Sequence, residues 1–198
     1  MSADLTVWLI RHPVPEVPPG ICYGQSEIGI AEPISGALAR VEAAGCHPAT
    51  LAQVFSSPWA RCRRLAEALS ASLVFDTRLS EMNFGHWEGQ PWDSIERAAI
   101  DEWAVDPLGF APPGGESARD MATRVVSFAT DLSRQFRAMV AQNTPCQIAI
   151  VAHHGPLRIL QAHWRDEPES VWLTRNFGYA TPVPLILDAV TLRSTEKR

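Results

Sequence analysis

The sequence predicts an α/β protein, a three-layer sandwich in which helices cover both faces of a largely parallel central sheet. Short apolar runs alternate with longer segments of helical periodicity, which is the pattern of strand–helix units around a parallel sheet. The runs are apolar at consecutive positions, as expected for strands buried on both faces. With 198 residues, 46% of them apolar and 20% charged, the chain suits a single globular domain over residues 1–198.

The strands are expected where short apolar runs meet turn residues. Residues 7–10 (Val-Trp-Leu-Ile) form the first run, and a Pro/Gly-rich loop follows over residues 13–20. Three further strands are expected at 51–55, 73–75 and 147–151. Two more are expected in the tail, near 171–176 and 185–187.

The helices are expected between these strands, and several have recognisable ends. A helix over 35–44 would be stopped by Gly45. Ser57-Pro58 has the form of an N-cap followed by proline at the first position of a helix that runs to about residue 70. The remaining helices are expected at 92–103, 116–141 and 156–163. The segment 83–115 interrupts the alternation, and we interpret it as an insertion that caps one end of the sheet.

Composition and charge argue against several classes of partner. The formal net charge is −5, so the protein has no general attraction for nucleic acid or an anionic membrane. The apolar stretch 5–10 is too short for a signal core or a membrane span, and a cytoplasmic protein is the expectation. The cysteines form no metal-binding pair and are expected to be reduced, small apolar residues: Cys22, Cys46, Cys62 and Cys146.

Arginine and histidine side chains follow three of the predicted strands. Arg11-His12 comes after the first strand, Arg61 lies one turn into the helix after the second, and His153-His154 follows the fourth. Ligands of parallel α/β sheets bind outside the carboxyl ends of the strands, so these side chains are expected to meet there. Two guanidinium groups and the helix N-termini would form a receptor for an anion such as phosphate. Each residue alone is better explained as structural, but their shared placement favours a site.

Such a site could hold phosphate or transfer it. A neutral imidazole is a competent nucleophile toward phosphorus, and the neighbouring arginines would keep His12 unprotonated near neutral pH. The arginines would also stabilise charge on the equatorial oxygens of the transferring group. An alkoxide leaving group needs a proton, and three carboxyl groups in glycine-containing loops could supply it: Glu81, Glu88 and Glu116. The residue pattern leaves all three open.

Motifs of competing chemistries are absent from the sequence. It contains no P-loop, no dinucleotide-binding fingerprint, no nucleophile elbow and no HExxH zinc motif. His153, His154 and His163 have no carboxylate or cysteine at ligand spacing. We therefore expect no metal ion.

Five segments, in order along the chain, resemble the motifs of the histidine phosphatase superfamily, the phosphoglycerate-mutase-like proteins. They are 9–12 (LIRH), 55–62 (FSSPWARC), 79–89 (LSEMNFGHWEG), 114–117 (GGES) and 151–158 (VAHHGPLR). The Arg-His pair alone is a weak signal, whereas five ordered segments are a specific one. The resemblance implies the phosphoglycerate-mutase-like fold.

The resemblance also implies a role for each matching residue. His12 would be the nucleophile that transiently carries the phosphoryl group, and Arg11 and Arg61 would hold the phosphate. His153 would complete the phosphate pocket, and Glu81 would donate the proton to the leaving group. The implied activity is a metal-independent phosphatase acting on a small phosphorylated substrate, and the resemblance implies no metal and no organic cofactor.

Within the superfamily, the chain is most similar to the α-ribazole phosphatase-like branch, through its length, the segment 79–89 and the segment 22–25 (CYGQ). The resemblance makes α-ribazole 5'-phosphate the first substrate to consider, with other small phosphorylated metabolites as alternatives. Tyr23, Gln25 and His154 are expected to contact the substrate. Pro13 stands where the family usually has glycine, and the loop 13–30 departs from the family pattern. The alternative function is a non-catalytic phosphate-binding or interaction module on the same fold.

Overall fold

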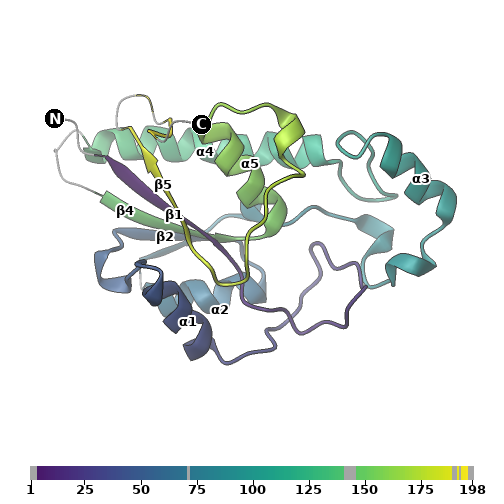
Figure 1. Cartoon of the computed structure of the whole chain (residues 1–198), viewed down its shortest axis with the longest axis horizontal. Helices are drawn as coiled ribbons and strands as arrows, with labels where there is room; N and C mark the ends of the chain where they lie inside the picture. The colour runs from purple at the N-terminus through teal and green to yellow at the C-terminus, as the bar shows by residue number, and fades with distance from the viewer. Residues whose placement is uncertain (1–3, 71, 141–145, 189–190, 192, 196–198) are drawn as a thin grey trace.

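The computed structural model describes residues 4–70, 72–140, 146–188, 191 and 193–195. Its centre is a five-stranded sheet in the order β3–β2–β4–β1–β5. The strands are β1 (Leu5–Arg11), β2 (Gln53–Ser56), β3 (Leu73–Phe75), β4 (Cys146–Ala152) and β5 (Val183–Leu187). The first four pair in parallel, and β5 pairs antiparallel with β1 at one edge (Figure 1). The largely parallel sheet expected from the sequence is therefore confirmed.

Helices cover both faces of this sheet. The α-helices are α1 (Ile34–Ala43), α2 (Ala60–Leu69), α3 (Arg97–Val105), α4 (Ala118–Val140) and α5 (His154–Trp164). Short 3₁₀ helices are η1 (Pro48–Thr50), η2 (Thr77–Leu79), η3 (Gly85–Trp87), η4 (Trp92–Ser94) and η5 (Glu169–Val171). Figure 1 shows α4 and α5 on one face of the sheet and α1 and α2 on the other. None of the described helices is long and apolar enough to cross a membrane.

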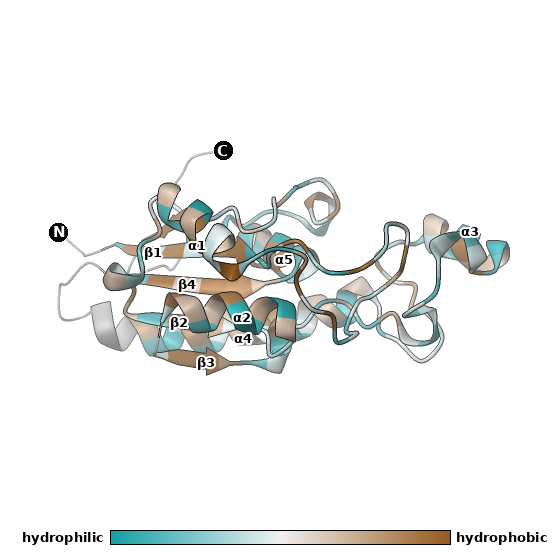
Figure 2. Cartoon of the chain, turned by 90° about the horizontal axis from the view of Figure 1, so that it is seen from below, coloured by the Kyte–Doolittle hydropathy of each residue, from teal (hydrophilic) through white to brown (hydrophobic). Residues whose placement is uncertain are grey.

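The core follows from the alternation of side chains along buried strands. Leu5, Val7 and Leu9 of β1 belong to the apolar cluster under α4 and α5, whereas Trp8 and Ile10 belong to the cluster under α1 and α2. All five side chains are buried. The apolar strands lie between helices of mixed polarity in Figure 2. The three-layer sandwich is thus confirmed, and its central strands are buried on both faces.

The expected strand near 171–176 is wrong. The segment contains the end of η5 and a turn, because the N–H groups of Trp172 and Thr174 donate to the carbonyls of Glu169 and Val171. Trp172 packs against the core cluster below α5 instead of alternating along a sheet. The edge of β1 is taken by β5, so no partner strand is left for this segment there.

Several expected helix boundaries also differ. Ser57 is not a helix cap: α2 begins at Ala60, and the Ser57 N–H donates to the Val151 carbonyl in continuation of the sheet. The single helix expected over 92–103 is divided into η4 and α3. The longest helix begins at Ala118, where Ser117 and Asp120 form a reciprocal capping pair. Its expected end at Ala141 lies outside the described residues.

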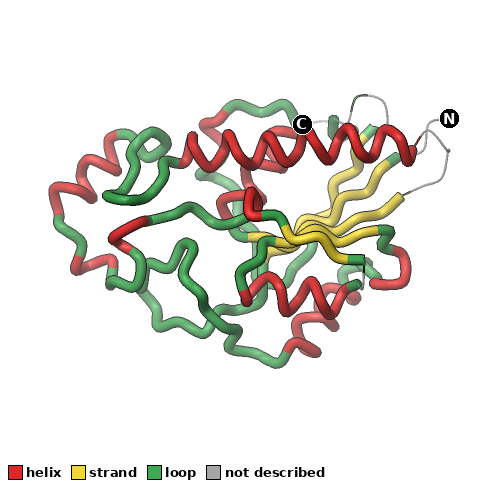
Figure 3. The backbone as a smooth tube through the Cα atoms, turned by 180° about the vertical axis from the view of Figure 1, so that it is seen from behind, coloured by secondary structure: helices red, strands yellow, loops and turns green. Residues whose placement is uncertain are grey.

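The segment 83–115 extends beyond the carboxyl ends of the strands, and Figure 3 shows the loops gathered at this end of the molecule, away from the N-terminus. Its interior is aromatic. The rings of Trp92 and Trp103 stack with centroids 5.6 Å apart, and those of Trp87 and Phe110 stack at 5.7 Å. Packing between aromatic rings stabilises this segment, which takes no part in the backbone hydrogen bonding of the sheet.

Candidate active site

The carboxyl ends of β1, β4 and β2 bring the expected residues together. The backbone N–H of His12 donates to the Ala152 carbonyl at 3.0 Å, so the chain just beyond β1 lies beside the chain just beyond β4. The imidazole rings of His12 and His153 meet edge to face with centroids 5.2 Å apart. Arg61 enters from the first turn of α2. Three strand ends therefore supply one cluster, as strand-end logic predicts.

His12 is held as a neutral imidazole in a fixed orientation. Its ring is buried, and its Nδ1 lies 2.7 Å from the carbonyl oxygen of Pro13. A carbonyl can only accept, so Nδ1 carries the proton and Nε2 keeps its lone pair. Burial, followed by the positive charge of Arg61, lowers the pKa of His12 to about 3. At neutral pH the ring is therefore neutral, with an unprotonated Nε2.

His153 has the opposite tautomer. The Nε–H of Arg61 donates to its Nδ1 at 3.2 Å, so the proton of the ring is on Nε2. That nitrogen lies 2.8 Å from the hydroxyl of Ser57 and 3.4 Å from the sulfur of Cys62. Burial and the nearby Arg61 hold the pKa of His153 well below its ordinary value. The ring is thus a neutral donor beside His12.

The two arginines bring positive charge with no carboxylate to cancel it. Arg61 is fully buried and donates to the carbonyls of Ser26 (2.7 Å) and Gly24. Arg11 donates to the Tyr179 hydroxyl at 3.1 Å, and its guanidinium lies 3.9 Å from the centre of the Tyr179 ring. Among the described residues, neither guanidinium forms an ion pair. Neutral groups fix the two guanidiniums, since Arg61 is held by backbone carbonyls and Arg11 by the Phe177 carbonyl and the Tyr179 hydroxyl, so their charge is not cancelled by these contacts.

Glu81 places its carboxylate at the N-terminus of α5. Its two oxygens accept the backbone N–H of Gly155 at 3.2 and 3.3 Å, and one of them also accepts the N–H of Met82 at 3.1 Å. A Cβ at position 155 would lie 2.4 Å from a Glu81 oxygen. The glycine therefore permits the close approach of this carboxylate to the helix.

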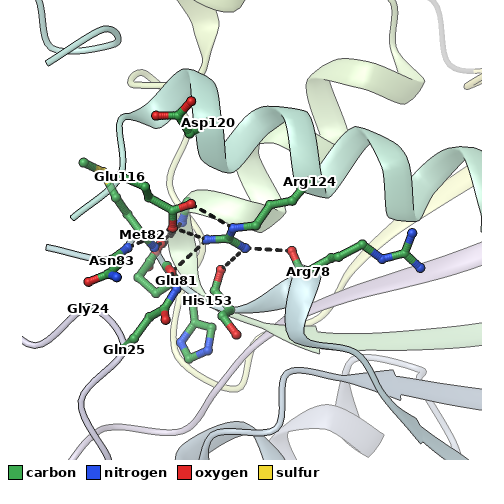
Figure 4. A network of polar contacts seen from close by, with 12 residues as sticks. Gly24, Gln25, Arg78, Glu81, Met82, Asn83, Glu116, Asp120, Arg124 and His153 are labelled. Atoms are coloured by element: carbon green, nitrogen blue, oxygen red, sulfur yellow. Dashed lines mark hydrogen bonds and ion pairs between the residues drawn. The ribbon is translucent and has the colours of Figure 1, made fainter. Parts of the chain in front are cut away.

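A half-buried arginine fixes the chain around Glu81 (Figure 4). Arg124 of α4 donates to the carbonyls of Arg78 (2.8 Å), Ser80 (2.7 Å) and Glu81 (2.9 Å). It also forms two hydrogen bonds with the Glu116 carboxylate, at 2.6 and 3.1 Å. One side chain thus binds three carbonyls within the four residues 78–81 that lead to Glu81.

The other two candidate carboxylates are engaged with backbone. Glu116 accepts the N–H of Asn83 at 2.9 Å in addition to its pair with Arg124. Glu88 accepts the N–H groups of Gln25 (2.8 Å) and Phe84 (3.1 Å) and the hydroxyl of Ser26. Both carboxylates hold loops in place, whereas Glu81 lines a cavity next to the cluster.

The three expected substrate residues lie in different environments. His154 lines the same cavity as Glu81, and burial followed by the charge of Arg11 lowers its pKa to about 4. The Gln25 side chain donates to the Glu81 carbonyl at 2.9 Å, so it supports the loop of Glu81. Tyr23 presents its ring 5.4 Å from the Arg61 guanidinium carbon. Neither Tyr23 nor Gln25 lines the cavity.

Some residues of the site were not found from the sequence. Ser57 was assigned to a helix cap, although it contacts His153. Arg124 and Tyr179 belong to segments without a spacing signal that links them to His12 or Glu81. In the part of the chain that the structure describes, no three His, Cys, Asp or Glu side chains are grouped to hold a metal ion.

The amino-acid sequence of the chain is similar to those of known proteins. A profile of the histidine phosphatase superfamily (branch 1) matches residues 7–187. A protein of Hydrogenobacter thermophilus, named provisionally as phosphoserine phosphatase 2, is 30% identical over 163 residues, which cover 78% of this chain and 75% of that protein.

Solved structures show the same fold. The α-ribazole phosphatase of Shigella flexneri is superimposed with a TM-score of 0.74 and 22% identity, over 97% of this chain and 94% of that one. A mycobacterial glucosyl-3-phosphoglycerate phosphatase gives a TM-score of 0.76 and 24% identity, over 96% and 95% of the two chains. The expected likeness to α-ribazole phosphatases and related enzymes is confirmed at the level of the fold.

Proposed function

The chain belongs to the histidine phosphatase superfamily, and we propose that it hydrolyses a small phosphomonoester through a phosphohistidine formed on His12. The main support for the proposal is the protonation state and tautomer of His12. Its Nδ1–H is occupied by the Pro13 carbonyl and its pKa is lowered to about 3, so Nε2 presents a lone pair at neutral pH. Arg61 and Arg11 bring positive charge to His12, and the neutral ring of His153 packs against it, which suits an anionic group bound at this nitrogen.

The reaction has two steps. In the first, Nε2 of His12 forms a bond to phosphorus, the bond from phosphorus to the ester oxygen breaks, and the Glu81 carboxyl gives its proton to that oxygen. In the second, water attacks phosphorus, Glu81 takes a proton from the water, and the bond between nitrogen and phosphorus breaks to release phosphate. No metal ion is needed for either step.

The relatives point to several substrates. Their names refer to phosphoserine, glucosyl-3-phosphoglycerate and α-ribazole phosphate. α-Ribazole 5'-phosphate stays a candidate for this chain on the strength of the segments 22–25 and 79–89. A non-catalytic phosphate-binding module is the weaker alternative, since binding phosphate does not require a carboxylate beside the anion, where it is repelled.

The proposal is tested with p-nitrophenyl phosphate in the presence of EDTA. We expect hydrolysis by the wild type and by the control His47→Asn, in which an exposed histidine is replaced. His12→Asn should lower kcat by at least about 10³-fold, the scale on which loss of a covalent nucleophile acts. Equal activity in the His12 variant and the wild type would refute the role of His12, and loss of wild-type activity in EDTA would refute metal independence.

A further inference from the structure

Glu81 and His154 line a cavity of about 320 Å³ beside the phosphate-binding cluster. The segment 83–115 contributes Phe84, Trp103 and Leu108 to its lining. Helices α4 and α5 and the turn after η5 contribute Met121, Ile159, Trp172 and Leu173. The volume is at the lower end of the range for small-molecule pockets. Residues far apart in the sequence thus form one cavity that includes the proposed proton donor.

The lining is apolar and rich in aromatic rings. No Ser, Thr, Asn or Gln is among its lining residues, all of which belong to the described part of the chain. Apart from the charged and imidazole side chains and the unpartnered indole N–H of Trp103, the lining offers few partners, so a sugar with several hydroxyl groups would lose more hydrogen bonds to water than it gains, and this costs free energy. The rings of Phe84, Trp103 and Trp172 offer apolar surface of the kind that packs on another ring.

The charge of the lining is nearly balanced. Arg158 is its single cation, and its Nε–H donates to the carbonyl of Arg175. Burial lowers the pKa of Arg158 below its ordinary value, and the charge of the Glu81 carboxylate opposes this shift. The lining therefore holds one guanidinium, already bonded to a backbone carbonyl, and one carboxylate, so a carboxylate on the ligand would meet the negative charge of Glu81 as well as the positive charge of Arg158.

We propose that the substrate is a phosphomonoester whose alcohol carries an uncharged, aromatic or otherwise bulky apolar body that fills this cavity. This inference rests on the proposed function, because a proton donor must touch the oxygen of the leaving group. The group attached to that oxygen then lies in the cavity that Glu81 lines. Amino-acid and polyol phosphates, such as phosphoserine and glycerol phosphate, fit this lining poorly.

A panel of esters with equal intrinsic reactivity tests the proposal. The probes are 2-(1-naphthyl)ethyl phosphate, O-phosphoserine and glycerol 3-phosphate, which all release a primary alkoxide. Burial of a bicyclic ring in an apolar cavity predicts a kcat/KM for the naphthyl ester at least about tenfold above the other two. A kcat/KM for phosphoserine or glycerol 3-phosphate equal to or above that of the naphthyl ester would overturn the proposal.

A pair of matched variants tests whether the preference for the naphthyl ester depends on the cavity. Leu173 lines the cavity and is 50% exposed, so Leu173→Asn should fold. It should raise KM for the naphthyl ester by about fivefold, with little change for glycerol 3-phosphate. The control Val105→Asn replaces an apolar side chain that is 87% exposed and outside the cavity, and it should change neither constant. Equal effects of Leu173→Asn on both esters would place the aromatic body elsewhere and contradict the proposal.

The proposed substrate preference and the proposed phosphatase activity would be refuted by different results. Hydrolysis of all three esters without preference would leave the phosphatase reaction intact and refute the apolar leaving group. If the wild type hydrolyses none of them, the proposed function fails. The cavity is then tested by calorimetry: tighter binding of (1-naphthyl)methylphosphonate than of methylphosphonate would support it, and equal affinity would refute it.

Discussion

The carboxylate of Glu81 rests on the backbone N–H of Gly155, with both oxygens within 3.3 Å of the nitrogen. His153, the residue that caps the same helix, lies in the buried cluster with His12 and Arg61. The first turn of α5 therefore sets the position of the proposed proton donor relative to the proposed phosphate pocket. The contact depends on the absence of a side chain at position 155.

Gly155→Ala should displace Glu81. The new Cβ would lie 2.4 Å from a carboxylate oxygen and 2.8 Å from the terminal methyl of Met121. We expect kcat for an alkyl phosphomonoester to fall by about 10²-fold, as in Glu81→Gln, with a smaller effect on p-nitrophenyl phosphate, whose leaving group needs no proton. Gly36→Ala is the matched control, because nothing lies within 4 Å of its Cβ. An unchanged kcat for the alkyl ester would show that Glu81 is not the donor.

Arg124→Met should loosen the loop that carries Glu81. The variant loses hydrogen bonds to the carbonyls of Arg78, Ser80 and Glu81 and leaves Glu116 without its partner. We expect the free energy of unfolding to fall by about 2–4 kcal/mol in urea titrations.

The same variant should also lower kcat for an alkyl ester more than kcat for p-nitrophenyl phosphate. The control is Arg134→Met on the same helix, where the side chain is 73% exposed and pairs with Asp131. That change should cost less than about 1 kcal/mol. A stability loss without the difference between the two esters would mean that Arg124 supports the fold alone.

The buried histidines should make stability depend on pH. Burial lowers the pKa of His12 to about 3 and that of His154 to about 4, against 6.5 for the unfolded chain. Below pH 6.5 the unfolded state binds protons that the folded state does not, so stability falls as the pH falls toward these values. The limiting slope is about 1.4 kcal/mol per pH unit for each such histidine.

Urea titrations between pH 6.5 and about pH 5 measure this slope above the range where the carboxyl groups of the unfolded chain titrate. His12→Gln should reduce the slope of stability against pH by the contribution of one histidine, which is at most about 1.4 kcal/mol per pH unit. A slope that is unchanged in the variant would show that His12 is protonated in the folded state.

Ser57→Ala should weaken the cluster at His153. The change removes the oxygen that lies 2.8 Å from Nε2 and leaves the sulfur of Cys62 as the nearest partner. An unsatisfied buried donor costs about 1–3 kcal/mol, which thermal unfolding would detect. Ser94→Ala, at an exposed position in η4, is the control and should be neutral. Equal stability of the two variants would argue against a hydrogen bond between Ser57 and His153.

The sequence by itself determined the layers and the place of the site. Continuous apolar runs require burial on both faces, which a parallel sheet between helices provides. Arg11-His12 and His153 each follow such a run, and the carboxyl ends of parallel strands meet at one edge of the sheet, so the sequence alone predicts that they lie together. The order of the five motifs identified the family.

Tertiary structure alone decided the rest. The residues around Ser57 have the pattern of a helix cap, but its hydroxyl lies within hydrogen-bond distance of His153, which follows the neighbouring strand β4. The segment 171–176 has strand-forming residues, but β5 occupies the edge of the sheet that it would need. Arg124 and Gly155 support Glu81 from two different helices. The preference of a short segment for helix or strand is worth less free energy than the hydrogen bonds of buried polar groups. Residues that are distant in sequence but in contact in the fold have no fixed spacing, so a sequence pattern does not reveal such pairs.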